Sequence, residues 1–197
     1  VSDVDGPFLS LSVGPESALE FVNIDYSGTT IIITPVLNWF GNIDLDVSAF
    51  DGEFLAEQSF SLTVLPINDS PIIDFIVDQI IAEDGILELV LSASDVEGDF
   101  LTFSASADNS EVNVVGESLT IVPNDDFFGD IEVTVEVNDG LLSDSTVFIL
   151  NVLPVNDAPI ISDISNQTID EDGSLSLTLS AFDVDEDSLT YSALSDN

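Results

Sequence analysis

The chain has 197 residues, with 39 Asp and Glu but no Lys, Arg or His, so its formal net charge at pH 7 is −39. Nucleic acids and anionic membranes attract positive charge, so this composition argues against both as partners. Cys is absent, which rules out disulfides. We find no leader-like segment and no apolar run long enough to span a membrane, so we expect no direct membrane insertion.

The charge also limits the chemistry available to the chain. Without His, Cys or Lys there is no nucleophile–base pair, no Schiff-base amine and no ligand set typical of zinc or copper. Oxygen ligands are abundant, and these suit Ca²⁺. A compact body with this charge needs salt or bound cations to offset its self-repulsion. We therefore predict a protein that is not an enzyme and that binds Ca²⁺.

A proline-framed motif recurs at a fixed interval. Residues 65–71 read LPINDSP and residues 153–159 read LPVNDAP, 88 positions later (157 − 69 = 88). An interval of this size indicates a tandem array of small domains, and the paired prolines stiffen each joint. We predict one complete repeat at 67–154, a repeat lacking its first strands at 1–66, and the first strands of a third repeat at 155–197. We accordingly expect the sequence to be part of a longer protein.

The complete repeat consists of short apolar segments separated by turn residues. Residues 131–137 (IEVTVEV) alternate apolar and polar side chains, as a strand with one wet face does. No helical periodicity competes. The predicted strands are 72–81, 87–92, 100–104, 112–115, 119–122, 131–137 and 145–152. This pattern favours an all-β fold, a seven-stranded Greek-key β-sandwich repeated in a linear array.

Two aromatic pairs also recur 88 residues apart. Trp39 and Phe40 match Phe127 and Phe128, and we interpret all four as core residues rather than as a sugar-stacking platform.

Acidic residues gather in repeated short loops. The DVD of residues 3–5, DVEGD of 95–99 and DVDED of 183–187 share carboxylates at i and i+2, and AEDG of 82–85 matches DEDG of 170–173. Carboxylates at this spacing in an extended loop turn their oxygens toward one pocket. Ca²⁺ takes six to eight oxygens of mixed carboxylate and carbonyl origin, so these loops are candidate ligand sets.

These residues resemble a known family. Residues 92–97 (SASDVE) followed by LTF, and residues 180–185 (SAFDVD) followed by LTYS, look like the A-x-D-x-D … L-x-Y signature of cadherin repeats. Residues 137–140 (VNDG) resemble the cadherin A-x-D-x-G, and the joint resembles its D-x-N-D-N-x-P linker with Pro in place of the first Asp. Over nearly the whole chain the ordered set is similar to cadherin-like and Ig-like tandem repeats of very large bacterial surface proteins.

The resemblance implies a calcium cluster at each joint. For the second joint the implied ligands are Glu83, Asp126, Asn156 through its carbonyl, Asp157, Asp183 and Asp185. For the first joint they are Asn68, Asp69, Asp95, Glu97 and Asp139. Asp3, Asp5 and Asp51 would belong to a joint preceding the chain. Asn38 stands where Asp126 stands one period later, so we expect the first joint to bind fewer ions or to bind them more weakly.

Three functions are compatible with these patterns. The leading one is an extracellular structural module that serves adhesion or cell-surface extension, with neighbouring repeats of the same chain as its partners and calcium stiffening the joints. The second is a protomer of a self-assembling extracellular filament or sheath, with other copies as partners. The third is a glycan-binding module, for which Tyr26, Trp39 and Tyr191 are the available aromatic side chains. The alternative for the acidic loops is that they are solvated residues of a salt-adapted protein.

Overall fold

The computed structural model describes residues 10–27 and 30–195, which form two compact units. Unit 1 comprises the described part of residues 1–70 together with residues 95–99. Unit 2 comprises residues 71–94 and the described part of residues 100–197. Nearly all regular structure is β, as predicted. Among the described residues no helix is long and apolar enough to cross a membrane.

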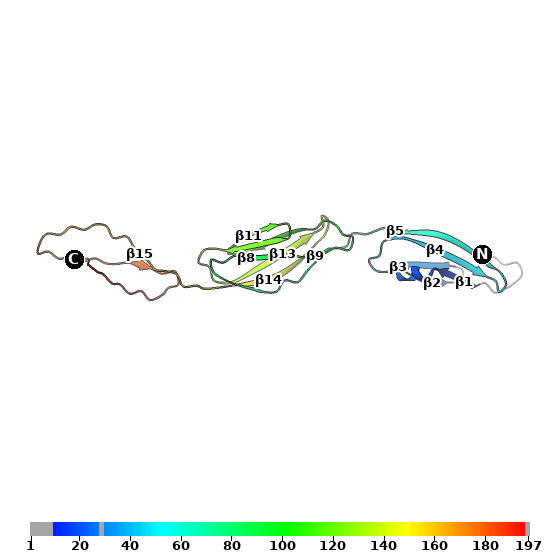
Figure 1. The fold of residues 1–197 in the computed structure, drawn as a ribbon, viewed down its shortest axis with the longest axis horizontal. Coiled ribbons are helices and arrows are strands. Elements are labelled where there is room, and N and C mark those ends of the chain that lie inside the picture. Colours follow the sequence, from blue (N-terminus) through cyan, green and yellow to red (C-terminus); the bar gives the residue numbers. More distant parts are fainter. Residues whose placement is uncertain (1–9, 28–29, 196–197) are drawn as a thin grey trace. The chain divides into compact units, whose positions relative to one another are not determined.

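Unit 2 contains a β-sandwich, which confirms the all-β sandwich part of the predicted fold class (Figure 1). One sheet has the strand order β10-β13-β14-β7 and the other has the order β11-β12-β8. Two short ladders, β6-β9 and β15-β16, accompany them. The strands are β6 (Ile72–Ile73), β7 (Gln79–Ala82), β8 (Leu87–Val90), β9 (Ala93–Ser94), β10 (Thr102–Ala107), β11 (Ser110–Val115), β12 (Ser118–Pro123), β13 (Gly129–Asn138), β14 (Ser143–Leu153), β15 (Ile160–Ile161) and β16 (Ala181–Phe182).

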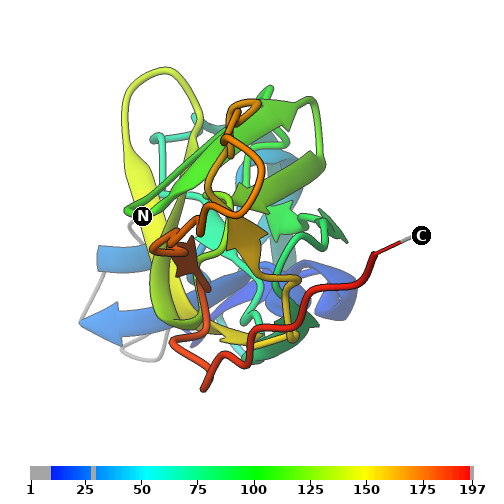
Figure 2. The same cartoon turned by 90° about the vertical axis from the view of Figure 1, so that its left-hand side faces the viewer.

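The sandwich core follows from the period-two pattern of its strands. Along β13, Val133, Val135 and Val137 are fully buried while the residues between them are exposed or half-buried. The adjoining β14 buries Phe148 and Leu150 on the same face, and Figure 2 shows this long antiparallel hairpin in yellow-green. Side chains of β8 and β12 from the second sheet complete the same cluster. The alternation of apolar and polar residues in the sequence thus gives each sheet one buried face.

The predicted first strand, 72–81, is wrong as a single element. It forms β6, which pairs antiparallel with β9, and β7, which pairs parallel with β14. Between β6 and β7 the chain leaves one ladder and joins the other. Two carboxylates hold this segment in place: Asp144 accepts from the Ile73 amide (3.0 Å), and Asp78 accepts from the Ile149 amide (2.8 Å). These side-chain bonds occupy backbone donors that continuous strand pairing would otherwise use.

We expect Phe148→Ala to destabilise unit 2 by about 3–5 kcal/mol, because it leaves a large cavity in a close-packed core. Phe148 is 1% exposed, whereas the neighbouring Val147 is 47% exposed, so Val147→Ala is the matched control and should cost under about 1 kcal/mol. Urea unfolding followed by circular dichroism measures both, and equal losses would contradict the assigned core.

Unit 1 has fewer strands around a smaller core. A three-stranded sheet, β1-β4-β5, is accompanied by the β2-β3 pair and one short 3₁₀ helix. Only Ala18, Val22 and Leu45 are buried apolar residues among those described here. The elements are β1 (Ser10–Gly14), η1 (Glu16–Glu20), β2 (Val22–Ser27), β3 (Thr30–Pro35), β4 (Gly41–Phe50) and β5 (Leu55–Val64).

The repeated aromatic pairs divide into one packed and one exposed member. Trp39 stacks on Phe21 (ring centroids 5.4 Å apart) and contacts the unit 1 core, and Phe127 packs against the unit 2 core. Phe40 and Phe128 are 37% and 54% exposed, so the core prediction is wrong for these two. Adjacent residues in extended backbone point to opposite sides, so one member of each pair faces away from the core.

Local structure recurs at the interval of the sequence repeat. β4 begins at Gly41 and β13 at Gly129, and β3 and β12 both end in the equivalent prolines Pro35 and Pro123. The left-handed backbone positions match as well: Asn38 (φ 61°) with Asp126 (φ 56°), and Asp84 (φ 59°) with Asp172 (φ 66°). Such conformations are uncommon for residues other than glycine, so their recurrence shows that equivalent loops fold alike.

Candidate metal centres

The first candidate centre, called here the Asp157 cluster, is formed by Glu83, Asp157 and Asp185. Glu83 follows β7, and its amide donates to the Leu153 carbonyl at 2.8 Å. Its side chain is 4% exposed and accepts from the Val155 amide. These two bonds fasten the end of β14 to the end of β7. They place a buried carboxylate beside the linker that carries Asp157.

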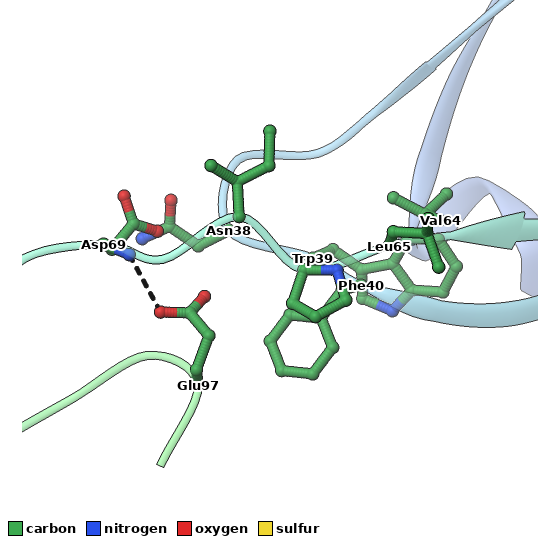
Figure 3. Close-up of a pocket in the computed structure, with 9 residues that line it drawn as sticks. Asn38, Trp39, Phe40, Val64, Leu65, Asp69 and Glu97 are labelled. Carbon is green, nitrogen blue, oxygen red and sulfur yellow. Dashed lines mark hydrogen bonds between the residues drawn. The ribbon is translucent and has the colours of Figure 1, made fainter. Parts of the chain in front are cut away.

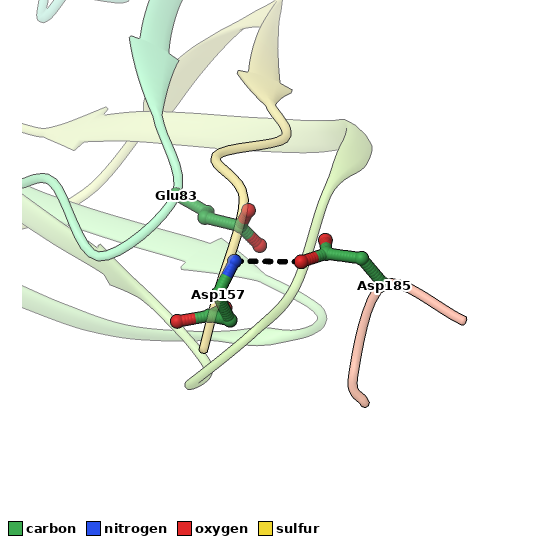
Figure 4. Close-up of side chains that lie close together, drawn as sticks. All are labelled: Glu83, Asp157 and Asp185. Atoms are coloured by element: carbon green, nitrogen blue, oxygen red, sulfur yellow. Dashed lines mark hydrogen bonds between the residues drawn. The ribbon is translucent and has the colours of Figure 1, made fainter. Parts of the chain in front are cut away.

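The linker turns toward the acidic loop that follows it. The Asp157 amide donates to Asp185 Oδ2 at 2.7 Å, and Figure 4 shows the carboxylates of Glu83 and Asp185 both turned toward this amide. One carboxylate oxygen from each of the three residues lies within 4.8 Å of the others. Asp157 Oδ2 is buried and has no hydrogen-bond partner among the described residues. A buried acceptor without a donor is costly, so the cluster is incomplete on its own.

Electrostatics single out the same residue. Burial raises the pKa of Asp157 above its ordinary value of 3.8, and the charges of Asp126, Asp185, Asp84 and Glu83 raise it further, in that order. Asp126 therefore acts on the cluster from the loop after β12. These carboxylates repel one another, and the chain has no side-chain cation that could offset the repulsion. Such an arrangement is typical of a cation site.

The acidic loop is shaped by Asp183. This residue is 7% exposed, and its Oδ1 accepts from the Asp187 amide at 3.1 Å. The bond folds residues 183–187 into a turn and thereby presents Asp185 to the linker. Asn156 donates through Nδ2 to the Asp157 carbonyl at 2.9 Å, which restrains the linker backbone. The structure thus places Asp183 and Asn156 in supporting positions around the three grouped carboxylates.

A second centre, the Asp95 cluster, lies within a single loop of unit 1, at positions equivalent to the acidic loop 183–187. Asp95, Glu97 and Asp99 each offer a carboxylate oxygen within 4.8 Å of the others. Asp95 Oδ1 accepts from the amides of Glu97 and Asp99, both at 3.0 Å, whereas its Oδ2 is buried and unpartnered among the described residues. The Asp69 amide donates to Glu97 Oε2 at 3.0 Å, as Asp157 does to Asp185. Asn68 donates to the Asp69 carbonyl.

An apolar pocket adjoins the bond between Asp69 and Glu97. Figure 3 shows Glu97 reaching the Asp69 amide, with Trp39 and Phe40 to one side. The pocket, of about 300 Å³, is also lined by Asn38 and by the end of β5 and the linker. An apolar wall beside the carboxylates limits their hydration and strengthens their electrostatic interactions.

Two predicted ligands occupy hairpin turns. Asp51 accepts from the amides of Glu53 (2.7 Å) and Phe54 (2.6 Å), and these bonds, that from Phe54 foremost, lower its pKa. Asp139, 88 residues later and in unit 2, accepts from the amides of Leu141 and Leu142 in the same way. Each closes its own hairpin. Asp3 and Asp5 lie outside the described residues.

The ligands implied by the family resemblance omit two carboxylates that belong with these centres, although both lie in the acidic loops named from the sequence. Asp99 lies in the Asp95 cluster, and Asp84 adds to the field at Asp157. Both stand in acidic runs that recur every 88 residues, and that recurrence is the signal that identifies them. Asp99 lies two residues after Glu97, whereas Asp84 directly follows Glu83.

The chemistry of both centres fits a hard divalent cation. Each offers carboxylate oxygens and one buried oxygen that lacks a donor, with no nitrogen or sulfur ligand. Glu83, Asp157 and Asp185 would hold an ion in one centre, and Asp95, Glu97 and Asp99 in the other. Calcium prefers such all-oxygen sets.

In chelator, the melting temperature should rise as the pH falls from about 7 to about 4, because the raised pKa of Asp157 makes the folded state bind a proton more tightly than the unfolded chain. Ionised Asp157 destabilises the folded state at pH values above its pKa in that state. The destabilisation is relieved as the pH falls through this pKa toward 3.8. Asp51 has the opposite effect, because its lowered pKa stabilises the folded state. This stabilisation is lost only as the pH falls toward and below 3.8. Calorimetry should show a smaller rise for Asp157→Asn, and an equal rise would contradict this assignment.

Comparisons with known proteins support the Ig-like character of the middle of the chain. Residues 68–150 match the family model described as bacterial Ig domain. A search of curated proteins found no match. Among solved structures, an endo-fucoidan hydrolase of glycoside hydrolase family 107 is 20% identical with a TM-score of 0.35, and the match covers 75% of this chain and 24% of that one.

Two cadherins are also among the similar structures. Human protocadherin-24 EC1-2 is 9% identical with a TM-score of 0.47, and the match covers 76% of this chain and 83% of that one. Drosophila N-cadherin EC1-4 is 16% identical with a TM-score of 0.42, and the match covers 92% and 51%. The chain spans about a quarter of the length of the hydrolase structures.

Proposed function

Because residues 68–150 match a bacterial Ig domain, we propose that the chain is a structural module of a large surface or secreted protein, stiffened by calcium at the joints between β-sandwich repeats. One observation carries the proposal. At positions 88 residues apart, a linker amide binds an acidic loop, Asp69 to Glu97 and Asp157 to Asp185. Each cluster also holds a buried carboxylate oxygen that has no donor among the described residues, at positions that are not equivalent: Asp95 Oδ2 and Asp157 Oδ2.

The charge balance at these points favours a bound cation. The chain has no Lys, Arg or His, so nothing within it can neutralise Asp157 and the carboxylates that raise its pKa. Water hydrates exposed carboxylates and counterions screen them, but both have little access to a buried oxygen. A bound divalent ion, when present, supplies positive charge and accepts several oxygen ligands at once. The recurrence of the bond between a linker amide and an acidic loop favours this over a merely salt-adapted surface.

The residues of the Asp157 cluster come from three segments of the chain. Glu83 lies in the middle repeat, Asp157 in the linker, and Asp185 in the repeat that follows. Ligands drawn from three segments restrain each segment relative to the others when a shared ion is held. Without the ion, the three carboxylates repel, and the joint bends more freely. This is how the chain converts calcium binding into stiffness.

The proposed setting is outside the cell, at a surface. Calcium sites in extracellular modules have dissociation constants in the range of about 10⁻⁴–10⁻³ M, and carboxylate loops of this kind suit such concentrations. Neighbouring repeats of the same chain are the immediate partners, and adhesion or extension from the cell surface is the task. The acidic loops recur along the chain, which suits a mechanical function better than a single active site.

Glycan binding receives less support from the aromatic residues. Trp39 packs on Phe21 and the core, and the Tyr26 hydroxyl accepts from the Val13 amide. Tyr191 is half-exposed but stands where Phe103 packs on the core one repeat earlier.

Isothermal titration calorimetry with CaCl₂ tests the proposal directly. The full chain, freed of metal by chelator and dialysis, should bind calcium saturably, and the Asp157 cluster should be occupied with the higher affinity. MgCl₂ should bind more weakly because Mg²⁺ demands a regular octahedral site. Absence of saturable calcium binding up to several millimolar would overturn the proposal.

A further inference from the structure

The beginning and the end of the middle repeat lie side by side in unit 2. Strand β7 pairs in parallel with β14, so that Gln79 lies opposite Leu150 and Ala82 opposite Leu153. β6 and β7 follow the first proline-framed linker, and β14 ends where the second linker begins. The two strands of a parallel pair run in the same direction. Tension that enters through one linker and leaves through the other therefore pulls β7 and β14 in opposite directions along their common axis.

Side-chain carboxylates extend this contact beyond the paired residues of β7. Asp144 Oδ2 accepts from the Ile73 amide at 3.0 Å, and Asp78 Oδ1 accepts from the Ile149 amide at 2.8 Å. Both bonds join residues 71 positions apart, which is also the offset of the backbone pairs between β7 and β14 (150 − 79 = 71). A single parallel register thus covers the whole segment from β6 to the end of β7.

Glu83 closes the far end of this register. Its amide donates to the Leu153 carbonyl at 2.8 Å, and its side chain accepts from the Val155 amide. Residues 73–83 and 144–155 together are called here the seam. At its first end, in its middle and at its last end, the seam is closed by a carboxylate that accepts from a backbone amide. Hydrogen bonds to ionised acceptors are stronger than those between neutral groups.

We propose that the seam sets the force at which unit 2 unfolds when the chain is pulled through its two linkers. Sliding β7 along β14 strains all bonds of the seam together, so the bonds must break in one step. Asp144 and Asp78 increase the number of bonds that break in this step. The longer hairpin of β13 and β14 is not strained first, because β13 is joined to neither linker.

The seam acts within one repeat, whereas the proposed calcium centres act at the joints. Asp144 and Asp78 belong to neither the Asp157 cluster nor the Asp95 cluster. Glu83 belongs to the seam and also to the Asp157 cluster, so measurements in chelator separate the seam from bound metal. Failure of the seam would leave the calcium proposal standing, and failure of calcium binding would leave the seam standing.

Pulling geometry tests the seam directly, because the chain has no Cys of its own and engineered thiols fix the points of attachment. Optical tweezers in chelator pull the full chain through Ile67→Cys and Ala158→Cys, two exposed linker positions, and this slides the seam. In the second geometry, Leu141→Cys, in the exposed turn before β14, replaces Ala158→Cys. The two attachment points then lie at the same end of the seam, so its bonds open one after another.

The unfolding force should be about twofold or more higher in the sliding geometry than in the second geometry, because forced unfolding follows the rate of barrier crossing. An unfolding force that is equal in the two geometries, or higher in the second, would overturn the proposal.

Asp144→Ala tests the contribution of the carboxylates. It removes the acceptor of the buried Ile73 amide, so the unfolding rate at a fixed force in the sliding geometry should rise about tenfold or more. Asp144→Asn keeps an acceptor oxygen without the charge and should have a smaller effect. Asp74→Ala is the matched control, because it removes one negative charge from an exposed residue of the same segment whose side chain makes no hydrogen bond to the described residues of the seam.

The control should change the unfolding rate by less than about twofold. Equal rates for Asp144→Ala and Asp74→Ala would refute the role of the carboxylates. Circular dichroism establishes that each variant is folded before it is pulled. If Asp144→Ala does not fold, Asp78→Ala, which removes an exposed acceptor of the same seam, is compared with Asp74→Ala in the same way.

Discussion

Saturating calcium is expected to raise the melting temperature of the chain by about 10 °C or more over the same buffer with chelator. A ligand present at 100 times its dissociation constant stabilises the folded state by about 2.7 kcal/mol per site. For a domain of 60–100 residues, each kcal/mol corresponds to about 4–8 °C. Ions held by Glu83, Asp157 and Asp185 bind only the folded arrangement, so the gain appears as a shift of the whole transition.

Differential scanning calorimetry at matched ionic strength separates this effect from screening. NaCl should raise the melting temperature gradually, because it weakens the mutual repulsion of all 39 acidic residues. Calcium should act at millimolar concentration and saturate. Equal transitions in calcium and in chelator would contradict a specific site.

Asp157→Asn is expected to weaken calcium binding at its cluster by about tenfold or more, equivalent to at least about 1.4 kcal/mol. The change removes an anionic ligand from the point where Asp126, Asp185, Asp84 and Glu83 concentrate their field. The neutral amide cannot replace the lost charge, although its shape is nearly the same. The β-sandwich core contains none of these residues, so the variant should retain its circular dichroism spectrum.

Asp163→Asn is the matched control for this variant. It removes one negative charge from an exposed residue in the same segment, outside both clusters. Calcium titrations by calorimetry should show an affinity within about twofold of the unmodified chain. If both variants weaken binding equally, calcium responds to net charge and not to the Asp157 cluster.

The β-sandwich was predictable because its strands are half-buried. In residues 131–137, apolar side chains alternate with Glu and Thr, and the structure buries Val133, Val135 and Val137 on one face of β13. The break within 72–81 was not predictable from local pattern. It depends on Asp144 and Asp78, whose partners lie 71 residues away in sequence.

The candidate sites were predictable to the extent that they depend on repetition. An interval of 88 residues aligned Asp69 with Asp157 and Glu97 with Asp185, and the structure forms the same amide–carboxylate bond in both pairs. The influence of Asp84 on Asp157 acts through space and has no spacing rule. Likewise, Trp39 packs against the core and Phe40 is exposed because the two side chains point to opposite sides of the backbone.

The most direct test of calcium stiffening is a distance distribution across the Asp157 cluster. Spin labels on Glu132→Cys, an exposed position of β13, and Ser192→Cys, in the segment after Asp185, report this joint by double electron–electron resonance. Calcium should give a narrow distribution, chelator a broad one, and Asp157→Asn a broad one in both. Distributions of equal width with and without calcium would contradict the account.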